Sequence, residues 1–138
     1  MATWLIDTAL FMMPASPKQT HLRRWCEAND ASLFLTAASL TEISEGIAKT
    51  SRKQSQRGNA LRVWFHDFTS SYADRIHLVD LEIAGRAGEL MSSIKNGPLR
   101  HRFHDAVLVA SAQAHGHGLL TRRDGIFGAW TNVAIAVI

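Results

Sequence analysis

Several features are scarce in this sequence, and each scarcity excludes a class of protein. The 138 residues contain one cysteine, Cys26, so neither an intrachain disulfide nor a cysteine-rich zinc site can form. Its neighbours Leu22 and Trp25 indicate a buried helix position for this thiol. No apolar run reaches the roughly 18 residues that a membrane-spanning helix needs. The N-terminus also lacks the basic start of a signal peptide. We therefore expect a soluble, cytoplasmic protein that has no membrane partner.

Charge of one sign is not in strong excess either. Lysine and arginine total 15 against 12 aspartates and glutamates, which gives +3 at pH 7 with neutral histidines. This mild excess permits an anionic partner such as nucleic acid without demonstrating one. The chain is 46% hydrophobic and 20% charged, an ordinary globular balance. Its length suits one domain, so we expect residues 1–138 to fold as a single unit.

Short apolar strands alternate with amphipathic helices along the chain. This order predicts an α/β protein, a three-layer α/β/α sandwich around a parallel sheet. Polar residues 51–59 are expected to form an exposed connection, residues 100–104 a short basic loop, and Asp80 a helix N-cap. Strands are predicted at 3–6, 32–36, 76–79, 119–121 and 133–138, and helices at 8–13, 17–29, from Ser39 or Thr41 to 51, 60–72, 81–95 and 105–115.

Two aspartates fall where such a sheet would bring them together. Asp7 ends the first strand, and open α/β sheets bind ligands at the C-terminal ends of their strands. The alternative is that Asp7 merely caps the following helical turn. Asp105 opens an almost wholly apolar helix, where the helix dipole alone would favour a carboxylate. A helix buried that deeply should nevertheless start at the same edge of the sheet.

Two further acids come from other segments. Glu42 lies beside the apolar positions Leu40 and Ile43 of its helix, and the alternative is a boundary glutamate with a solvated carboxylate. Asp124 follows the strand at 119–121, and its loop is brought to the same edge by the topology. Loop acids are otherwise usually solvated.

Four carboxylates gathered at one edge would repel one another unless a cation neutralised them. Oxygen ligands select hard ions, and the lack of cysteine or paired histidine ligands disfavours zinc. The acids therefore predict Mg²⁺ or Mn²⁺, held by carboxylates and water. Such a site polarises a phosphodiester and activates water for in-line attack.

Four motifs of this sequence together resemble those of a known protein family. The chain resembles PIN-domain ribonucleases, and more closely the VapC-like toxins of type II toxin–antitoxin pairs, over its full length. Each fragment is weak alone, but their order within a chain of this size is fairly specific. The motifs are Leu5-Ile6-Asp7-Thr8, Leu40-Thr41-Glu42-Ile43-Ser44-Glu45-Gly46, His104-Asp105-Ala106-Val107-Leu108-Val109-Ala110-Ser111-Ala112 and Leu120-Thr121-Arg122.

The resemblance implies a PIN fold with a central five-stranded parallel sheet. It also implies Mg²⁺- or Mn²⁺-dependent cleavage of RNA, a homodimer, and neutralisation by a cognate antitoxin. By motif position, Asp7, Glu42 and Asp105 would be catalytic metal ligands. Thr8 and Thr121 would be hydroxyl partners for a ligand or for metal-bound water.

Two positions depart from the family pattern. Ala9 stands where the family usually has Asn or Ser, and this removes one polar contact to the site. Arg123 stands where it usually has Asp or Asn, with Asp124 one residue later. Either Asp124 substitutes as the fourth catalytic acid, or the site keeps three acids and Arg123 binds a phosphate or weakens metal affinity. A weakened PIN module that binds RNA or an antitoxin without efficient cleavage is therefore the alternative.

Basic residues next to the site segments are the candidates for holding RNA phosphates. These are Arg100, Arg102, Arg122 and Arg123. The group at 52–57 is more typical of a solvated surface, and His101 and His104 of local polar residues than of proton carriers.

A phosphatase of the haloacid-dehalogenase type is a second enzyme class to consider. That chemistry needs a second aspartate two residues after the first, and Ala9 occupies that position. This counts against a phosphatase.

Overall fold

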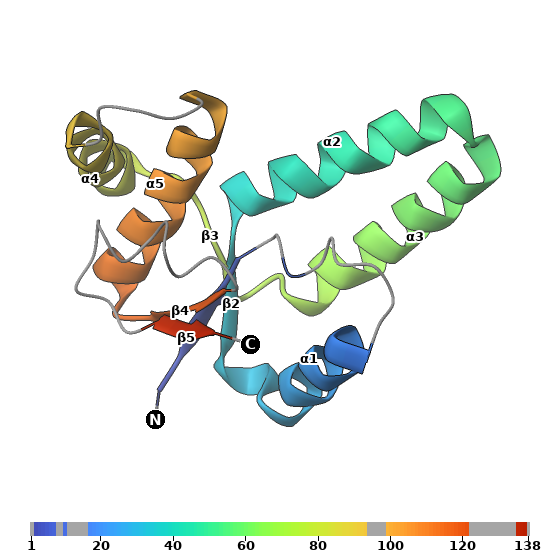
Figure 1. Cartoon of the computed structure of the whole chain (residues 1–138), viewed down its shortest axis with the longest axis horizontal. Coiled ribbons are helices and arrows are strands. Elements are labelled where there is room, and N and C mark those ends of the chain that lie inside the picture. The colour runs from blue at the N-terminus through green and yellow to red at the C-terminus, as the bar shows by residue number, and fades with distance from the viewer. Residues whose placement is uncertain (1, 8–9, 11–16, 94–98, 122–134, 138) are drawn as a thin grey trace.

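The computed structural model describes residues 2–7, 10, 17–93, 99–121 and 135–137, in which helices alternate with short strands (Figure 1). Within these ranges, no helix is both long and apolar enough to cross a membrane. The strands are β1 (Trp4–Ile6), β2 (Leu33–Thr36), β3 (Ile76–His77), β4 (Gly118–Thr121) and β5 (Ile135–Val137), and the helices are α1 (Pro17–Ala28), α2 (Ala37–Lys53), α3 (Ser55–Ser71), α4 (Leu81–Ser92) and α5 (Leu99–His115), with a 3-10 turn η2 at Asp30–Ser32.

All the strand pairs are parallel, which confirms the predicted α/β class. Strands β2, β1, β4 and β5 form the body of the sheet, and β3 extends the order to β3-β2-β1-β4-β5. The third predicted strand, 76–79, is therefore reduced to a two-residue pairing with β2. Leu78 and Val79 lie beyond it and are 70% and 40% exposed, so no packing extends the strand.

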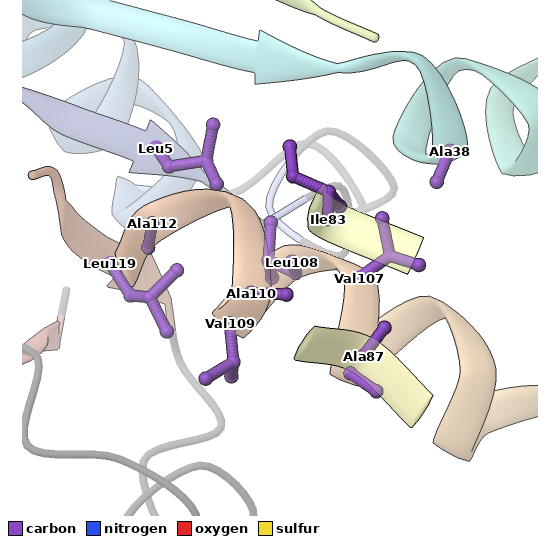
Figure 2. Packing of buried hydrophobic residues seen from close by; sticks show 11 residues of the cluster. Leu5, Ala38, Ile83, Ala87, Val107, Leu108, Val109, Ala110, Ala112 and Leu119 are labelled. Atoms are coloured by element: carbon purple, nitrogen blue, oxygen red, sulfur yellow. The ribbon is translucent and has the colours of Figure 1, made fainter. Parts of the chain in front are cut away.

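Alternate residues of the central strands point to opposite faces of the sheet. Leu5 and Leu119 belong to a buried cluster with Ile83 of α4 and Val107 of α5, as Figure 2 shows. Their neighbours Ile6 and Leu120 belong to a second cluster, onto which Trp25 of α1 and Phe68 of α3 pack. The predicted layering of helices on both faces of the sheet is thus confirmed.

Helices α2 and α3 form an antiparallel hairpin that projects from the sheet (Figure 1). The predicted exposed connection over 51–59 is wrong, because Gln54 alone separates the two helices. The tight join depends on Gly58, since a Cβ atom there would lie 2.1 Å from Ser51 Oγ and 2.6 Å from Ser51 Cα. The polar side chains over 52–57 are exposed as expected, but they are carried almost entirely by helix.

Helix α5 begins at Leu99, so the predicted basic loop at 100–104 is also wrong. No glycine or proline occurs between Leu99 and His115, so nothing in that segment stops a helix. Asp105 therefore lies in the second turn of α5, beyond the first turn in which the helix dipole acts. The dipole does not explain why this carboxylate is there.

The caps of two helices are set by side chains. The Asp80 carboxylate accepts a hydrogen bond from the Ile83 N–H at 2.9 Å, which confirms its predicted role at the start of α4. The start of α2 was predicted at Ser39 or Thr41, and this is wrong. Thr36, the last residue of β2, caps α2 by accepting from the Ser39 N–H at 3.0 Å. Strand β2 therefore passes directly into α2.

Candidate metal and RNA site

Asp7 follows β1 directly and lies at the C-terminal edge of the sheet, where its side chain is 1% exposed. Its backbone N–H donates to the Leu120 carbonyl at 2.9 Å, which continues the pairing of β1 with β4. Its carboxylate Oδ2 accepts a hydrogen bond of 2.6 Å from the hydroxyl of Thr121, the last residue of β4. Thr121 is fully buried. A hydroxyl from one strand thus holds the carboxylate that ends its neighbour.

The place of this pair in the sheet order is informative. The chain passes from β1 to β2 on one side, whereas β4 lies on the other side of β1. This is the point where strand order reverses, and parallel α/β sheets bind ligands in the crevice outside the strand ends at such a point. The Asp7–Thr121 pair therefore lies at the expected position for a ligand site.

Asp105 approaches the same edge from α5. This helix ends at His115, shortly before β4 starts at Gly118 on the N-terminal edge of the sheet. Its 17 residues span about 25 Å at 1.5 Å per residue, so its first turns lie toward the opposite edge. The Asp105 side chain is 5% exposed, in the middle of a helix. A carboxylate buried there needs compensation from a partner or a cation.

Glu42 is connected to the segment that carries Asp105. Its Oε1 atom lies 2.7 Å from Nδ1 of His104, the residue before Asp105, and the contact joins α2 to α5. Both side chains are mostly covered, with 34% of Glu42 and 18% of His104 exposed. The structure thus brings Glu42 to the α5 segment that contains Asp105. The partner of Glu42 is a histidine that sequence reasoning treated as a local polar residue.

The donor set fits a hard cation in part. Asp7 and Asp105 are buried carboxylates, and Mg²⁺ is commonly held by one or two carboxylates together with water. Within the described part of the chain, no three histidine, cysteine, aspartate or glutamate side chains are grouped to hold a metal ion. The residues therefore fit an ion that is held by few protein ligands and otherwise by water. Glu42 is in contact with His104.

Several predicted site residues fall outside what the structure describes. The backbones of Arg100 and Arg102 lie in α5, but their side chains are outside the described set. Their proposed contacts with RNA, and the choice between Asp124 and Arg123, stay predictions. The others outside the described residues are Thr8, Ala9, Arg122, Arg123 and Asp124.

Thiol chemistry is disfavoured by the surroundings of the single cysteine. Burial, together with the nearby carboxylates of Asp30 and Glu27, raises the pKa of the Cys26 thiol to about 11. The reactive form of a cysteine is the thiolate, which is scarce at neutral pH when the pKa is that high. This agrees with the helix position predicted for Cys26.

Comparison with known proteins gives a fold. No family model and no curated protein matches the chain. Among solved structures, FitAcB from Neisseria gonorrhoeae is 20% identical with a TM-score of 0.79, covering 96% of each chain. DNA-bound VapBC from Salmonella typhimurium is 17% identical with a TM-score of 0.75, covering 99% of this chain and 98% of that one. VapBC-5 from Mycobacterium tuberculosis is 21% identical with a TM-score of 0.61, covering 100% and 98%.

The chain has a VapC-like PIN fold. The resemblance drawn from the sequence motifs is thereby confirmed at the level of the fold. In this chain the candidate site consists of the contacts of Asp7 and Glu42 and the buried carboxylate of Asp105.

A second polar cluster joins the residues just before β1 and β4 to the end of β3, and it was not predicted. His117, just before β4, has Nε2 2.8 Å from His77 Nε2 and Nδ1 2.6 Å from Thr3 Oγ1. The His77 ring stacks on His115 at 3.6 Å between centroids, and the His117 ring stacks on Phe34 at 4.3 Å. The members come from four distant segments, so no local pattern pointed to them.

Burial keeps two of these histidines, His77 and His117, neutral. Burial, followed by the neighbouring His77 and His115, lowers the pKa of His117 from 6.5 to about 4. Burial and His115 also lower the pKa of His77. Both imidazoles are therefore uncharged at neutral pH, and His117 is buried at 7% exposure.

Proposed function

We propose that this protein is a metal-dependent endoribonuclease toxin that hydrolyses RNA phosphodiester bonds. The observation that carries the proposal is the burial of Asp7 and Asp105, which are 1% and 5% exposed. Buried carboxylates at the C-terminal edge of a parallel sheet lie where such sheets bind ligands, and Thr121 orients the Asp7 carboxylate there. Carboxylate oxygens directed to one edge support the binding of a hard cation such as Mg²⁺.

The roles of the residues follow from their positions. Asp7 and Asp105 would hold Mg²⁺, with Mn²⁺ as a substitute. When bound, the ion supplies the activation of water and the neutralisation of phosphate charge. Thr121 fixes the orientation of the Asp7 carboxylate through its 2.6 Å hydrogen bond. Glu42, held by His104, would contribute directly or through water.

Substrate and partners are part of the same proposal. Arg100, Arg102, Arg122 and Arg123 would bind RNA phosphates without reading sequence. VapBC-5 belongs to a family of toxin–antitoxin systems, and this supports a cognate antitoxin as the partner of this chain. We also propose a homodimer and a cytoplasmic location, where RNA and antitoxin are both available.

The direct test is the Asp7→Asn variant, assayed on single-stranded RNA with Mg²⁺ and again with EDTA. We expect cleavage to fall by about 100-fold or more, because a ligand carboxylate is replaced by a neutral amide of similar size. Asp67→Asn is the matched control, since that side chain is 76% exposed on α3. Both variants should keep the wild-type circular dichroism spectrum. If Asp7→Asn cleaved RNA as fast as wild type, the proposal would be refuted.

A weakened module that binds RNA or an antitoxin without efficient cleavage is the second candidate. Two observations favour it. Ala9 and Arg123 depart from the family pattern, and no three-ligand metal group occurs among the described residues. Calorimetric titration with Mn²⁺ separates the candidates. Absence of binding at millimolar ion, together with retained RNA binding, would favour the module.

A further inference from the structure

We propose that His104 is a positioning residue for Glu42. In this role His104 holds one carboxylate oxygen, so that the other can face the cation or its bound water. The inference rests on the proposed function, because Glu42 matters for catalysis only if the site binds a metal. The observation behind it is the 2.7 Å contact between His104 Nδ1 and Glu42 Oε1.

The two glutamates of this part of α2 have different partners. Glu45 pairs with Lys49 on the same helix, at 2.8 Å between Glu45 Oε1 and Lys49 Nζ, and that lysine is 62% exposed. Such exposed pairs one turn apart contribute little to stability. Glu42 instead reaches across to a different helix and a mostly covered histidine. A contact between helices orients a carboxylate far more tightly than an exposed pair within one helix.

The position of His104 links this contact to the rest of the site. His104 directly precedes Asp105, so one turn of α5 both carries the buried Asp105 and contacts Glu42. Helices α2 and α5 also share a buried cluster that includes Ala38 and Val107, both visible in Figure 2. The backbone positions of the two partners are therefore fixed by packing.

The chemistry of the contact defines what His104 must supply. An ionised carboxylate only accepts hydrogen bonds, so Nδ1 must carry the hydrogen and donate it to Oε1. A carboxylate has two oxygens, and one held through Oε1 presents Oε2 in a restricted direction. Hydrogen bonds of this kind to metal-binding side chains commonly raise metal affinity by about 10- to 100-fold.

The test uses three substitutions at position 104. His104→Asn keeps an N–H donor at the place of Nδ1, whereas His104→Gln places it near Nε2 and His104→Ala removes it. We expect His104→Ala and His104→Gln to weaken Mn²⁺ binding, measured by calorimetry, by about 10-fold or more. His104→Asn should largely restore it. In a Glu42→Leu background, which lacks the acceptor oxygen, His104→Ala should have no further effect on Mn²⁺ affinity.

Lys49→Ala is the matched control, because it breaks the neighbouring Glu45 pair on α2 and should leave Mn²⁺ affinity unchanged. Each variant's thermal unfolding shows whether a loss of affinity reflects unfolding. Unchanged or tighter Mn²⁺ binding in His104→Ala would overturn the role. An equal loss of Mn²⁺ affinity caused by His104→Ala in the Glu42→Leu background would also overturn it.

A second readout needs no metal and separates this inference from the proposed function. In ¹⁵N spectra of labelled histidines, His104 should be the tautomer with hydrogen on Nδ1 in wild type, and should lose that preference in Glu42→Leu, which has no acceptor. If the wild type neither binds Mn²⁺ nor cleaves RNA, the proposed function fails, and these spectra still test the His104–Glu42 contact. An unchanged His104 signal in Glu42→Leu would overturn that contact.

Discussion

The Thr121 hydroxyl donates a 2.6 Å hydrogen bond to the Asp7 carboxylate, across a sequence separation of 114 residues. Both side chains are at most 1% exposed, so bulk water cannot replace the bond. The bond joins the ends of β1 and β4 at the edge of the sheet, at the point where the strand order reverses. Structural integrity and the candidate site therefore depend on the same pair of atoms.

Replacing Thr121 by valine removes this donor and keeps the β-branched shape. We expect the free energy of unfolding to fall by about 1.5–3 kcal/mol, the usual loss when a hydrogen bond to a charged group is removed. Thr121→Ser retains the hydroxyl and should lose much less. Thr41→Val removes an exposed hydroxyl bonded to the Ala37 carbonyl and should change stability by less than about 0.5 kcal/mol. Urea unfolding measures all three; equal stability of Thr121→Val and wild type would contradict the prediction.

The α2–α3 hairpin should be sensitive to a single methyl group. A Cβ atom at Gly58 would lie 2.6 Å from the Ser51 Cα, a backbone atom that cannot move aside alone. We therefore expect Gly58→Ala to destabilise the protein by about 1–3 kcal/mol, as overpacking does. Gly85→Ala in α4 meets no atom within 4 Å and should stabilise by up to about 1 kcal/mol through helix propensity. If thermal unfolding showed that both substitutions change the melting temperature in the same direction, this would argue against the close approach of Gly58 to Ser51.

The histidine cluster predicts a loss of stability in mild acid. The unfolded chain has a His117 pKa near 6.5, and the folded chain has about 4, so the unfolded state binds its proton first. The free energy of unfolding should therefore fall as pH drops from about 6.5 to about 4, by at most about 1.4 kcal/mol per pH unit for this group. His77, whose pKa is also lowered, adds to the same trend.

His117→Asn tests this assignment. Asparagine keeps a polar atom near Nδ1 for the bond with Thr3 but cannot be protonated. Urea unfolding of both proteins between pH 7 and 4.5 should show a shallower decline in the variant. The carboxylates titrate in both proteins, so their contribution to the pH dependence cancels in the difference between the two curves. Parallel curves would show that His117 does not titrate as assigned.

Local sequence patterns predicted the fold correctly where the helices and strands are regular. Short apolar runs such as Leu5-Ile6 and Leu119-Leu120 indicated buried strands of a parallel sheet, and both faces of these strands are covered. Helix boundaries were less accurate because they depend on contacts. The hairpin join at Gln54 depends on Gly58 meeting Ser51, which no local pattern reveals.

The candidate site was partly predictable for the same reason. Asp7 was expected at a strand end, and it lies there. Asp105 was expected at a helix start, but α5 begins six residues earlier, so its burial has another cause. The His104–Glu42 contact depends on how α2 crosses α5, and that approach is set by tertiary packing.

The burial of Asp105 leads to a last prediction, which concerns how the stability of the protein depends on Mn²⁺. Asp105 is 5% exposed in α5, and Asp105→Asn removes its charge at nearly constant size. Mn²⁺ should raise the melting temperature of wild type by several degrees at saturation, because it binds only the folded state. It should raise that of Asp105→Asn far less.

Asp74→Asn serves as the control, since that side chain is 86% exposed and should respond to Mn²⁺ as wild type does. If Asp105→Asn gained the full Mn²⁺ shift, the ion would be bound elsewhere. Loss of the Mn²⁺ shift in Asp105→Asn, with the full shift kept in Asp74→Asn, is the pattern expected of a residue that binds the cation.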